Sequence, residues 1–140
     1  LVPIGKADLK REGSKVTIIT WSKNLFMVLE AAKELAEQHN IEADVLDLLS
    51  LRPLDVDAIY NSVAKTNRVV IVQEQHEVAS YGAYLSHLIS SNMLDALDAP
   101  VKLVSTLEVP MPYSKALEAV ILPNKQKVMA ACLEVLKGCL

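Results

Sequence analysis

The side chains best suited to acid–base or nucleophilic chemistry in this sequence are histidines and cysteines. They are His39, His76, His87, Cys132 and Cys139. His76 is the strongest candidate, because Glu74 and Glu77 lie close by in the sequence and a carboxylate neighbour lets a histidine act as a general base. The residues around it supply no nucleophile and no oxyanion site, and loops are commonly polar. The residues therefore favour a solvated loop at His76 over catalysis by His76.

The other members of this set have structural explanations. His39 ends a predicted helix, where it interacts favourably with the negative end of the helix dipole, and His87 falls near the polar face of another helix. Cys132 and Cys139 are seven residues apart in one predicted helix, a rise of about 10.5 Å, which is too long for a disulfide. Their apolar surroundings indicate packed, reduced thiols in a reducing compartment.

The sequence lacks the common catalytic and cofactor motifs. It contains no G-x-G-x-x-G, no G-x-x-x-x-G-K-[ST], no G-x-S-x-G, no H-E-x-x-H and no paired-cysteine metal spacing, and it has only four glycines. Asp44 and Asp47, on a predicted strand, form at most a weak carboxylate pair. We therefore expect no catalytic, cofactor-binding or metal-binding residue in this chain.

Composition excludes other classes of function. The 140 residues predict one domain, 1–140, and 51% of them are apolar with one Phe and one Trp, so the core must be aliphatic. The net charge of −3 and the absence of a basic stripe exclude a typical nucleic-acid surface. No run approaches the roughly 18 apolar residues of a membrane span. Because the chain starts at Leu1 and not at Met, we expect a processed product or a fragment of something larger.

The elements that must position these side chains alternate between strand and helix. The apolar run Val69 to Val72 is typical of a strand covered on both faces. The predicted strands are 7–10, 15–21, 41–49, 69–72 and 101–107, and the predicted helices are 25–38, 56–66, 81–92 and 125–137. Ser22 or Asn24 should cap the first helix and Asp55 the second. Alternation of this kind predicts an α/β fold with a mostly parallel sheet.

Two connections carry further predictions. Gly13 and Ser14 give a turn signal that would pair the first two strands as a hairpin. Pro110, Pro112 and Pro123 predict an extended crossing between the last strand and the last helix.

Short phrases in this sequence carry a family resemblance that spans nearly the whole chain. They are PIGKA (3–7), RPLD (52–55), KTNR (65–68), LDAP (97–100) and VPMPY (109–113). Each is weak alone, but their combination and order resemble the C-terminal domain of the transketolase superfamily. Within it, the chain is most similar to the β subunit of the first, decarboxylating component of pyruvate dehydrogenase and related 2-oxo acid dehydrogenases.

The resemblance implies a specific architecture. It has three layers, helix–sheet–helix, around a five-stranded, mostly parallel mixed sheet whose first strand is antiparallel, with strand order 1-3-2-4-5. This order contradicts the hairpin at Gly13, and we follow the resemblance because periodicity does not determine sheet order. The family often has more glycines after VVIVQE, where this chain has only Gly82, so the contacts of that loop are expected to differ.

The resemblance also implies a function for the parent protein. That protein would use thiamine diphosphate with Mg to decarboxylate pyruvate oxidatively and acetylate a lipoyl arm, on the way to acetyl-CoA. The catalytic and cofactor groups would lie in a preceding domain, and this domain would serve assembly. The implied partners are the α subunit, a second β subunit and the subunit-binding domain of the dihydrolipoyl acetyltransferase. The implied location is a bacterial cytoplasm or a mitochondrial or plastid matrix.

Two residues are implied to bind a partner. Asp98 of LDAP matches the acidic docking surface of the family, and the terminal carboxylate of Leu140 would assist it. Charge pairs of this kind speed encounter and fix specificity more than they add affinity. The alternative explanation for Asp98 is that it caps a turn before Pro100.

Other functions stay open at this point. The chain could be the matching domain of a transketolase or a deoxyxylulose-phosphate synthase, although LDAP and VPMPY argue against this. It could be a free-standing enzyme that uses His76 and Glu74. It could also be a stand-alone interaction module derived from such a domain.

Overall fold

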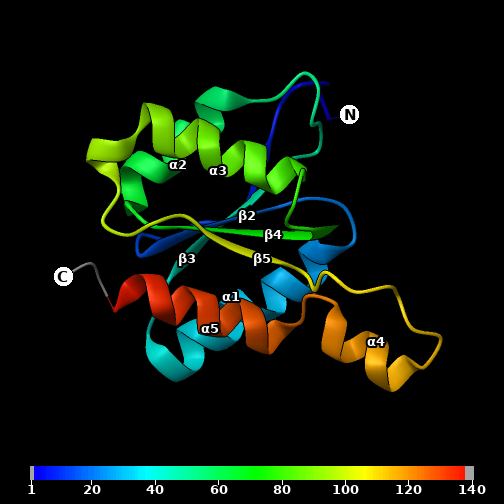
Figure 1. Ribbon diagram of the computed structural model, residues 1–140. Coiled ribbons are helices and arrows are strands. Elements are labelled where there is room, and N and C mark those ends of the chain that lie inside the picture. Colours follow the sequence, from blue (N-terminus) through cyan, green and yellow to red (C-terminus); the bar gives the residue numbers. More distant parts are fainter. Residues whose placement is uncertain (1, 138–140) are drawn as a thin grey trace.

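The computed structural model describes residues 2–137 and has three layers, with helices on both faces of a central sheet (Figure 1). The strands are β1 (Asp8–Arg11), β2 (Val16–Thr20), β3 (Ala43–Asp47), β4 (Val69–His76) and β5 (Lys102–Thr106). The helices are α1 (Asn24–His39), α2 (Val56–Thr66), α3 (Tyr81–Asn92), the 3₁₀ turn η1 (Leu94–Ala96), α4 (Lys115–Ile121) and α5 (Lys125–Leu136). The α/β class and the three layers are confirmed.

The five strands lie in the order β1-β3-β2-β4-β5, with β1 antiparallel to β3 and all other pairs parallel. This is the order that the family resemblance implied, and the hairpin suggested by Gly13 is wrong. The chain instead passes from β1 across the end of β3 before it enters β2. Gly13 packs so closely there that a side chain would overlap the backbone of Ala43. The glycine therefore permits a close crossing and does not form a hairpin turn.

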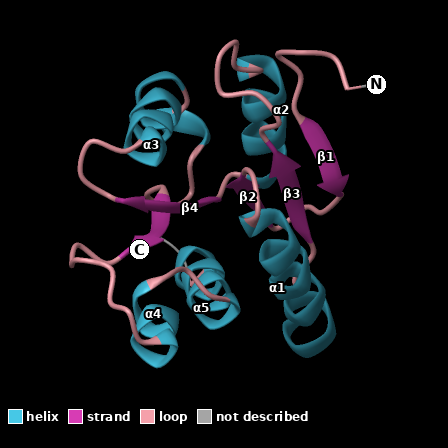
Figure 2. Ribbon diagram, turned by 90° about the vertical axis from the view of Figure 1, so that its right-hand side faces the viewer, coloured by secondary structure: helices cyan, strands magenta, loops and turns pink. Residues whose placement is uncertain are grey.

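The core lies on both faces of the sheet, because the inner strands supply buried apolar side chains to each face. Every residue of β2 and β3 is buried, as are the first five residues of β4. Alternate residues point to opposite faces, so Val70 packs toward α1 and α5 whereas Ile71 packs toward α2 and α3. Figure 2 shows the two helix layers on either side of the strands.

The N-cap that the sequence predicts is observed for α2 and is not observed for α1. The carboxylate of Asp55 accepts hydrogen bonds from the backbone N–H of Ala58 at 3.2 Å and of Ala7 at 3.1 Å, so the predicted cap of α2 is confirmed. The predicted cap of α1 by Ser22 or Asn24 is wrong. Lys23 occupies the N-cap position without a side-chain hydrogen bond. A turn with Ser22 in a left-handed conformation leads into this helix without a polar cap.

The segment after β5 extends away from the three layers and contains α4, so the predicted extended crossing is wrong at residues 115–121 (Figure 1). Residues 107–121 are called the arm below. Its proline-rich part, through Pro112, forms neither helix nor strand, and a short helix then begins at Lys115 with Ser114 in the N-cap position. Proline restricts the backbone of its own residue and does not prevent a helix from starting a few residues later. Within residues 2–137, no helix has the length and apolar character needed to span a membrane.

Candidate functional site

His76, the strongest catalytic candidate, lies at the exposed end of β4. The carboxylate of Glu74 is 2.7 Å from the ammonium nitrogen of Lys23. This hydrogen bond and charge raise the pKa of Lys23 above its usual value. Among residues 2–137, no hydrogen bond or ion pair connects His76 with a carboxylate. Glu74 therefore pairs with Lys23, and the structure does not contain the pair of His76 and Glu74 that the sequence suggested.

The turn that follows β4 is built around the buried amide of Gln73. Its nitrogen donates to the hydroxyls of Ser80 at 2.7 Å and Ser105 at 3.0 Å, and its oxygen accepts the N–H of Gly82 at 2.8 Å. A side chain at Gly82 would lie 2.5 Å from this oxygen. Position 82 therefore needs a glycine, because any side chain there would block the approach of the Gln73 amide to the backbone of α3. Ser80 also accepts a hydrogen bond from the N–H of Ala83 as the N-cap of α3.

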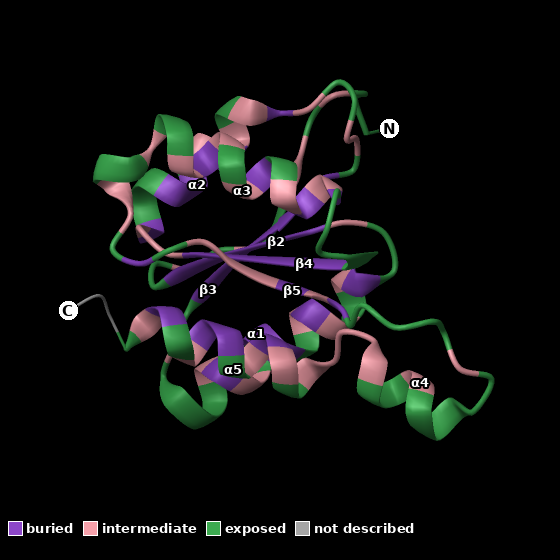
Figure 3. Cartoon of the chain, in the orientation of Figure 1, coloured by how far each residue is buried: buried purple, intermediate pink, exposed green. Residues whose placement is uncertain are grey.

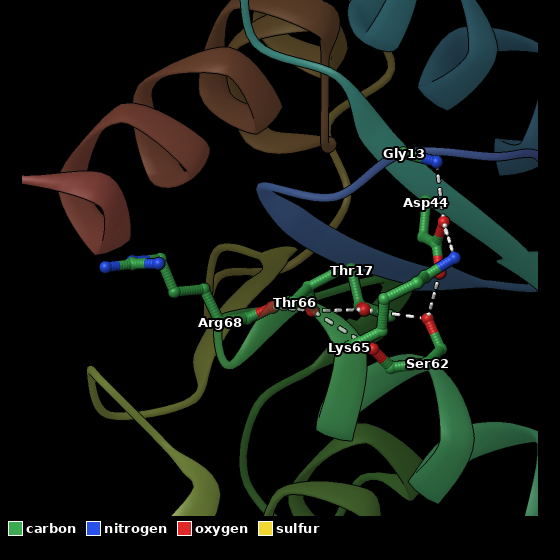
Figure 4. Close-up of polar contacts among 7 residues, drawn as sticks. All are labelled: Gly13, Thr17, Asp44, Ser62, Lys65, Thr66 and Arg68. Carbon is green, nitrogen blue, oxygen red and sulfur yellow. Dashed lines mark hydrogen bonds and ion pairs between the residues drawn. The ribbon is translucent and has the colours of Figure 1, made fainter.

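The fully buried Asp44 is the centre of a polar cluster between β2, β3 and α2 (Figure 4). Its carboxylate accepts hydrogen bonds from the N–H of Gly13 at 2.6 Å, the hydroxyl of Ser62 at 2.6 Å and the ammonium of Lys65 at 2.7 Å. The Thr17 hydroxyl lies 2.8 Å from that of Ser62. A buried charge needs such partners, and these satisfy it. The arrangement explains Asp44 as a structural group.

Asp47 lies three residues farther along β3, beside β1, and takes no part in the Asp44 cluster. Burial raises the pKa of Asp47 above its usual value, while Lys10 acts in the opposite direction and Asp8 adds to the rise. The structure therefore does not bring Asp44 and Asp47 together as a pair.

Cys132 is buried on the inner face of α5, and this burial raises the pKa of its thiol to about 12. A thiol with so high a pKa is a poor nucleophile at neutral pH, so the prediction of a packed thiol is confirmed. Cys139 lies outside the described residues. His39 ends α1 and His87 lies exposed on α3 near the hydroxyl of Ser91 at 3.3 Å, and both agree with their structural explanations.

Asp98, predicted to bind a partner, is exposed in the turn between η1 and β5, with 52% of its side chain accessible. Its carboxylate lies 3.1 Å from the guanidinium of Arg68. The turn itself is held by Asn67, whose carbonyl accepts the N–H of Asp98 at 2.8 Å and whose amide donates to the carbonyl of Ala96 at 2.7 Å. The carboxylate is thus displayed on a fixed turn. Leu140, the second predicted partner-binding residue, lies outside the described residues.

The arm is an apolar surface that the sequence reasoning missed. Figure 3 shows it almost entirely exposed, in contrast to the three layers. No residue of α4 is buried. The sequence gives no clear signal of this surface, because periodicity does not show whether the apolar residues around α4 pack into the core or stay exposed.

The model of the transketolase C-terminal domain family matches residues 5–128. The chain belongs to this family. The phrases RPLD, KTNR, LDAP and VPMPY lie within the matched range, PIGKA overlaps its start, and the strand order is the one that the resemblance implied.

Several β subunits align with almost the whole of this chain but are much longer than it. The β subunit of acetoin:2,6-dichlorophenolindophenol oxidoreductase from Bacillus subtilis is 43% identical over 96% of this chain and 39% of its own length. The pyruvate dehydrogenase E1 component subunit β of Rickettsia felis is 42% identical over 96% of this chain and 41% of its own length. The chain thus spans about two fifths of the length of these relatives.

A solved structure of similar fold supports the same assignment. A split-gene transketolase, described as an inactive β4 tetramer, superposes with a TM-score of 0.81 at 28% identity, over 95% of this chain and 42% of the other. A transketolase from Pichia stipitis superposes with a TM-score of 0.63 at 12% identity, which is evidence of the fold alone.

Proposed function

We propose that this chain is the C-terminal assembly and docking domain of the β subunit of a thiamine-diphosphate-dependent 2-oxo acid dehydrogenase of the pyruvate type. The observation that carries the proposal is 42% identity, over nearly the whole chain, to a pyruvate dehydrogenase β subunit. In this proposal the complete enzyme decarboxylates pyruvate oxidatively and acetylates a lipoyl arm, and the whole complex forms acetyl-CoA. Bacterial and mitochondrial β subunits are both similar, so we propose a bacterial cytoplasm or an organelle matrix as its location.

The cofactor of this reaction does not fit the described residues. Within residues 2–137, no group of three or more His, Cys, Asp or Glu side chains could hold a metal ion. Gly82, the glycine nearest the end of β4, is occupied by its contact with Gln73, which leaves no glycine-rich loop there for a diphosphate. Thiamine diphosphate and Mg therefore belong, in this proposal, to other parts of the complete enzyme.

The partners of the domain follow from the proposed role. They are an α subunit, a second β subunit and the subunit-binding domain of a dihydrolipoyl acetyltransferase. For the last, we propose docking at Asp98, because this carboxylate is exposed on a turn whose backbone is fixed by Asn67. A basic side chain of the partner would share the carboxylate with Arg68. Ion pairing at such a site should set specificity and association rate.

The docking test is a calorimetric titration of the subunit-binding domain into the complete assembled enzyme. We expect Asp98→Ala to weaken binding by tenfold or more, and Asp95→Ala, an exposed acid one turn earlier, to leave it unchanged. The wild-type affinity should also fall with added salt, because salt screens exposed charges. Equal affinity of the wild type and the Asp98→Ala enzyme would contradict docking at this residue.

A second candidate function is supported by the 43% identity to the acetoin oxidoreductase β subunit. The complete β polypeptide, combined with the α-type subunit of its own organism, should be assayed with pyruvate and with acetoin, using 2,6-dichlorophenolindophenol as the electron acceptor. We expect faster reduction with pyruvate. Faster reduction with acetoin would favour the second candidate, and no reduction with either substrate would contradict both.

A further inference from the structure

The carboxylate of Asp98 already has a cationic neighbour within the domain. Its Oδ2 atom lies 3.1 Å from the Nη2 atom of Arg68, and only 25% of the Arg68 side chain is accessible. Because 52% of the Asp98 side chain is accessible, a second cation can reach the same carboxylate from outside. Arg68 and a basic partner would therefore meet at one anion.

The end of α2 places Arg68 beside this turn. The carbonyl of Asn67 accepts the N–H of Asp98 at 2.8 Å, and the carbonyl of Arg68 itself accepts the N–H of Thr17 at 2.8 Å. Figure 4 shows the Arg68 side chain extending away from the Asp44 cluster. The guanidinium therefore lies at the docking turn and outside the buried cluster.

The ion pair of Arg68 and Asp98 is not the strongest that these two side chains can form. An arginine binds a carboxylate most strongly through two parallel N–H donors. The Nε atom of Arg68 is buried and has no hydrogen-bond acceptor among residues 2–137, so it does not supply a second donor. Exposed ion pairs contribute little to stability. We therefore expect the fold to tolerate the loss of this pair.

The charge of Arg68 opposes the docking of a basic partner. It offsets the negative charge of Asp98 that would attract the partner, and it repels a second cation that approaches the same carboxylate. Without the guanidinium, Asp98 would be an unshared anion on a turn whose backbone is still held by Asn67.

We propose that Arg68 is an internal competitor for the carboxylate of Asp98 and lowers the affinity of the docking turn for basic partners. The inference rests on the proposed function, in which the subunit-binding domain docks at Asp98. It goes beyond that function by assigning to Arg68 the control of docking strength. A basic surface that does not offset the repulsion from Arg68 is rejected, so the same residue makes docking more selective.

The test is a calorimetric titration of the subunit-binding domain of the dihydrolipoyl acetyltransferase into the complete assembled enzyme. We expect Arg68→Gln to tighten binding about threefold, the size of one exposed charge interaction, and to steepen the loss of affinity with salt. Arg68→Ala, a second neutral variant, should give the same gain. Arg68→Lys keeps the charge and should bind as the wild type does.

Arg11→Gln is the matched control. Arg11 forms an exposed ion pair with Glu42, at 2.6 Å and with 29% of the arginine side chain accessible. It lies on β1, at the opposite edge of the sheet from β5. The control should leave docking unchanged, and the melting temperature of each variant enzyme establishes that it remains folded.

The outcomes separate this inference from the proposed function. Weaker binding by Arg68→Gln would overturn the inference, because it would show that Arg68 positions the carboxylate for the partner. Unchanged binding, or an equal gain in Arg11→Gln, would overturn it as well. In each of these cases docking at Asp98 stands as long as Asp98→Ala weakens binding. Wild-type affinity in Asp98→Ala would refute the docking site itself.

Discussion

The sheet and the arm use apolar residues in opposite ways. In β4, Val69 to Val72 are completely buried between two helix layers. In the arm, apolar residues of similar size remain exposed around α4, and the segment adds nothing to the core. Burial of apolar surface is the main favourable contribution to folding. The sheet therefore holds the domain together, whereas the arm leaves apolar side chains exposed.

The same contrast applies to the charges of the two regions. Asp44 is buried and accepts three hydrogen bonds within the domain, including one from Lys65. Glu118, in the arm, has no salt bridge within residues 2–137. A carboxylate in the sheet layer is thus satisfied internally, whereas those beside the arm remain available to a partner.

The largest expected difference between the regions concerns apolar packing. Ile71→Ala should lower the free energy of unfolding by about 2 to 5 kcal/mol, because a buried side chain is lost and a cavity remains. Leu117→Ala in the arm should change it by less than about 0.5 kcal/mol. Urea unfolding of the two variants measures both values. Similar losses for the two would show that the arm is part of the folding core.

A somewhat smaller difference is expected for the charges. Asp44→Ala should cost about 3 kcal/mol, because it leaves the N–H of Gly13 and the hydroxyl of Ser62 without their acceptor and Lys65 without its counter-charge. Glu118→Ala should have little effect on stability. The comparison is again made by urea unfolding. A loss below about 1 kcal/mol at Asp44 would show that water replaces these contacts.

The smallest expected effect concerns the pH dependence of stability. Because burial raises the pKa of Asp47, the folded state binds this proton more tightly than the unfolded chain does. Stability contributed by the protonated form is therefore present at low pH and lost as the pH rises through the folded-state pKa. Asp47→Asn should then be at least as stable as the wild type at neutral pH. Its advantage should disappear on acidification, which melting temperatures of the variant and the wild type across a pH series would measure.

The sequence predicts the layers well because the elements that build the core repeat with the period of their structure. Val69 to Val72 indicated a strand covered on both faces, and Asp55 was identified as a helix cap from its type and position. Sheet order could not be derived in this way, since Gly13 gives the same local signal for a hairpin turn and for a close crossing. Only the family resemblance supplied the correct order.

The candidate sites were less predictable than the fold. Glu74 and Glu77 lie close to His76 in the sequence and suggested an acid–base pair, but Glu74 forms an ion pair with Lys23, which comes from a distant part of the chain. The arm was missed because an exposed apolar helix has the same residue types as one that faces the core. Asp98 as a docking residue stays a prediction, although its fixed, exposed position suits that role.

The most direct measurement is hydrogen–deuterium exchange of this domain, which compares the sheet with the arm. We predict that backbone amides of Val69 to Val72 exchange at least tenfold more slowly than those of residues 107–114, because buried core strands open least often. Equal exchange rates in the two segments would contradict the separation of a buried folding core from an exposed arm.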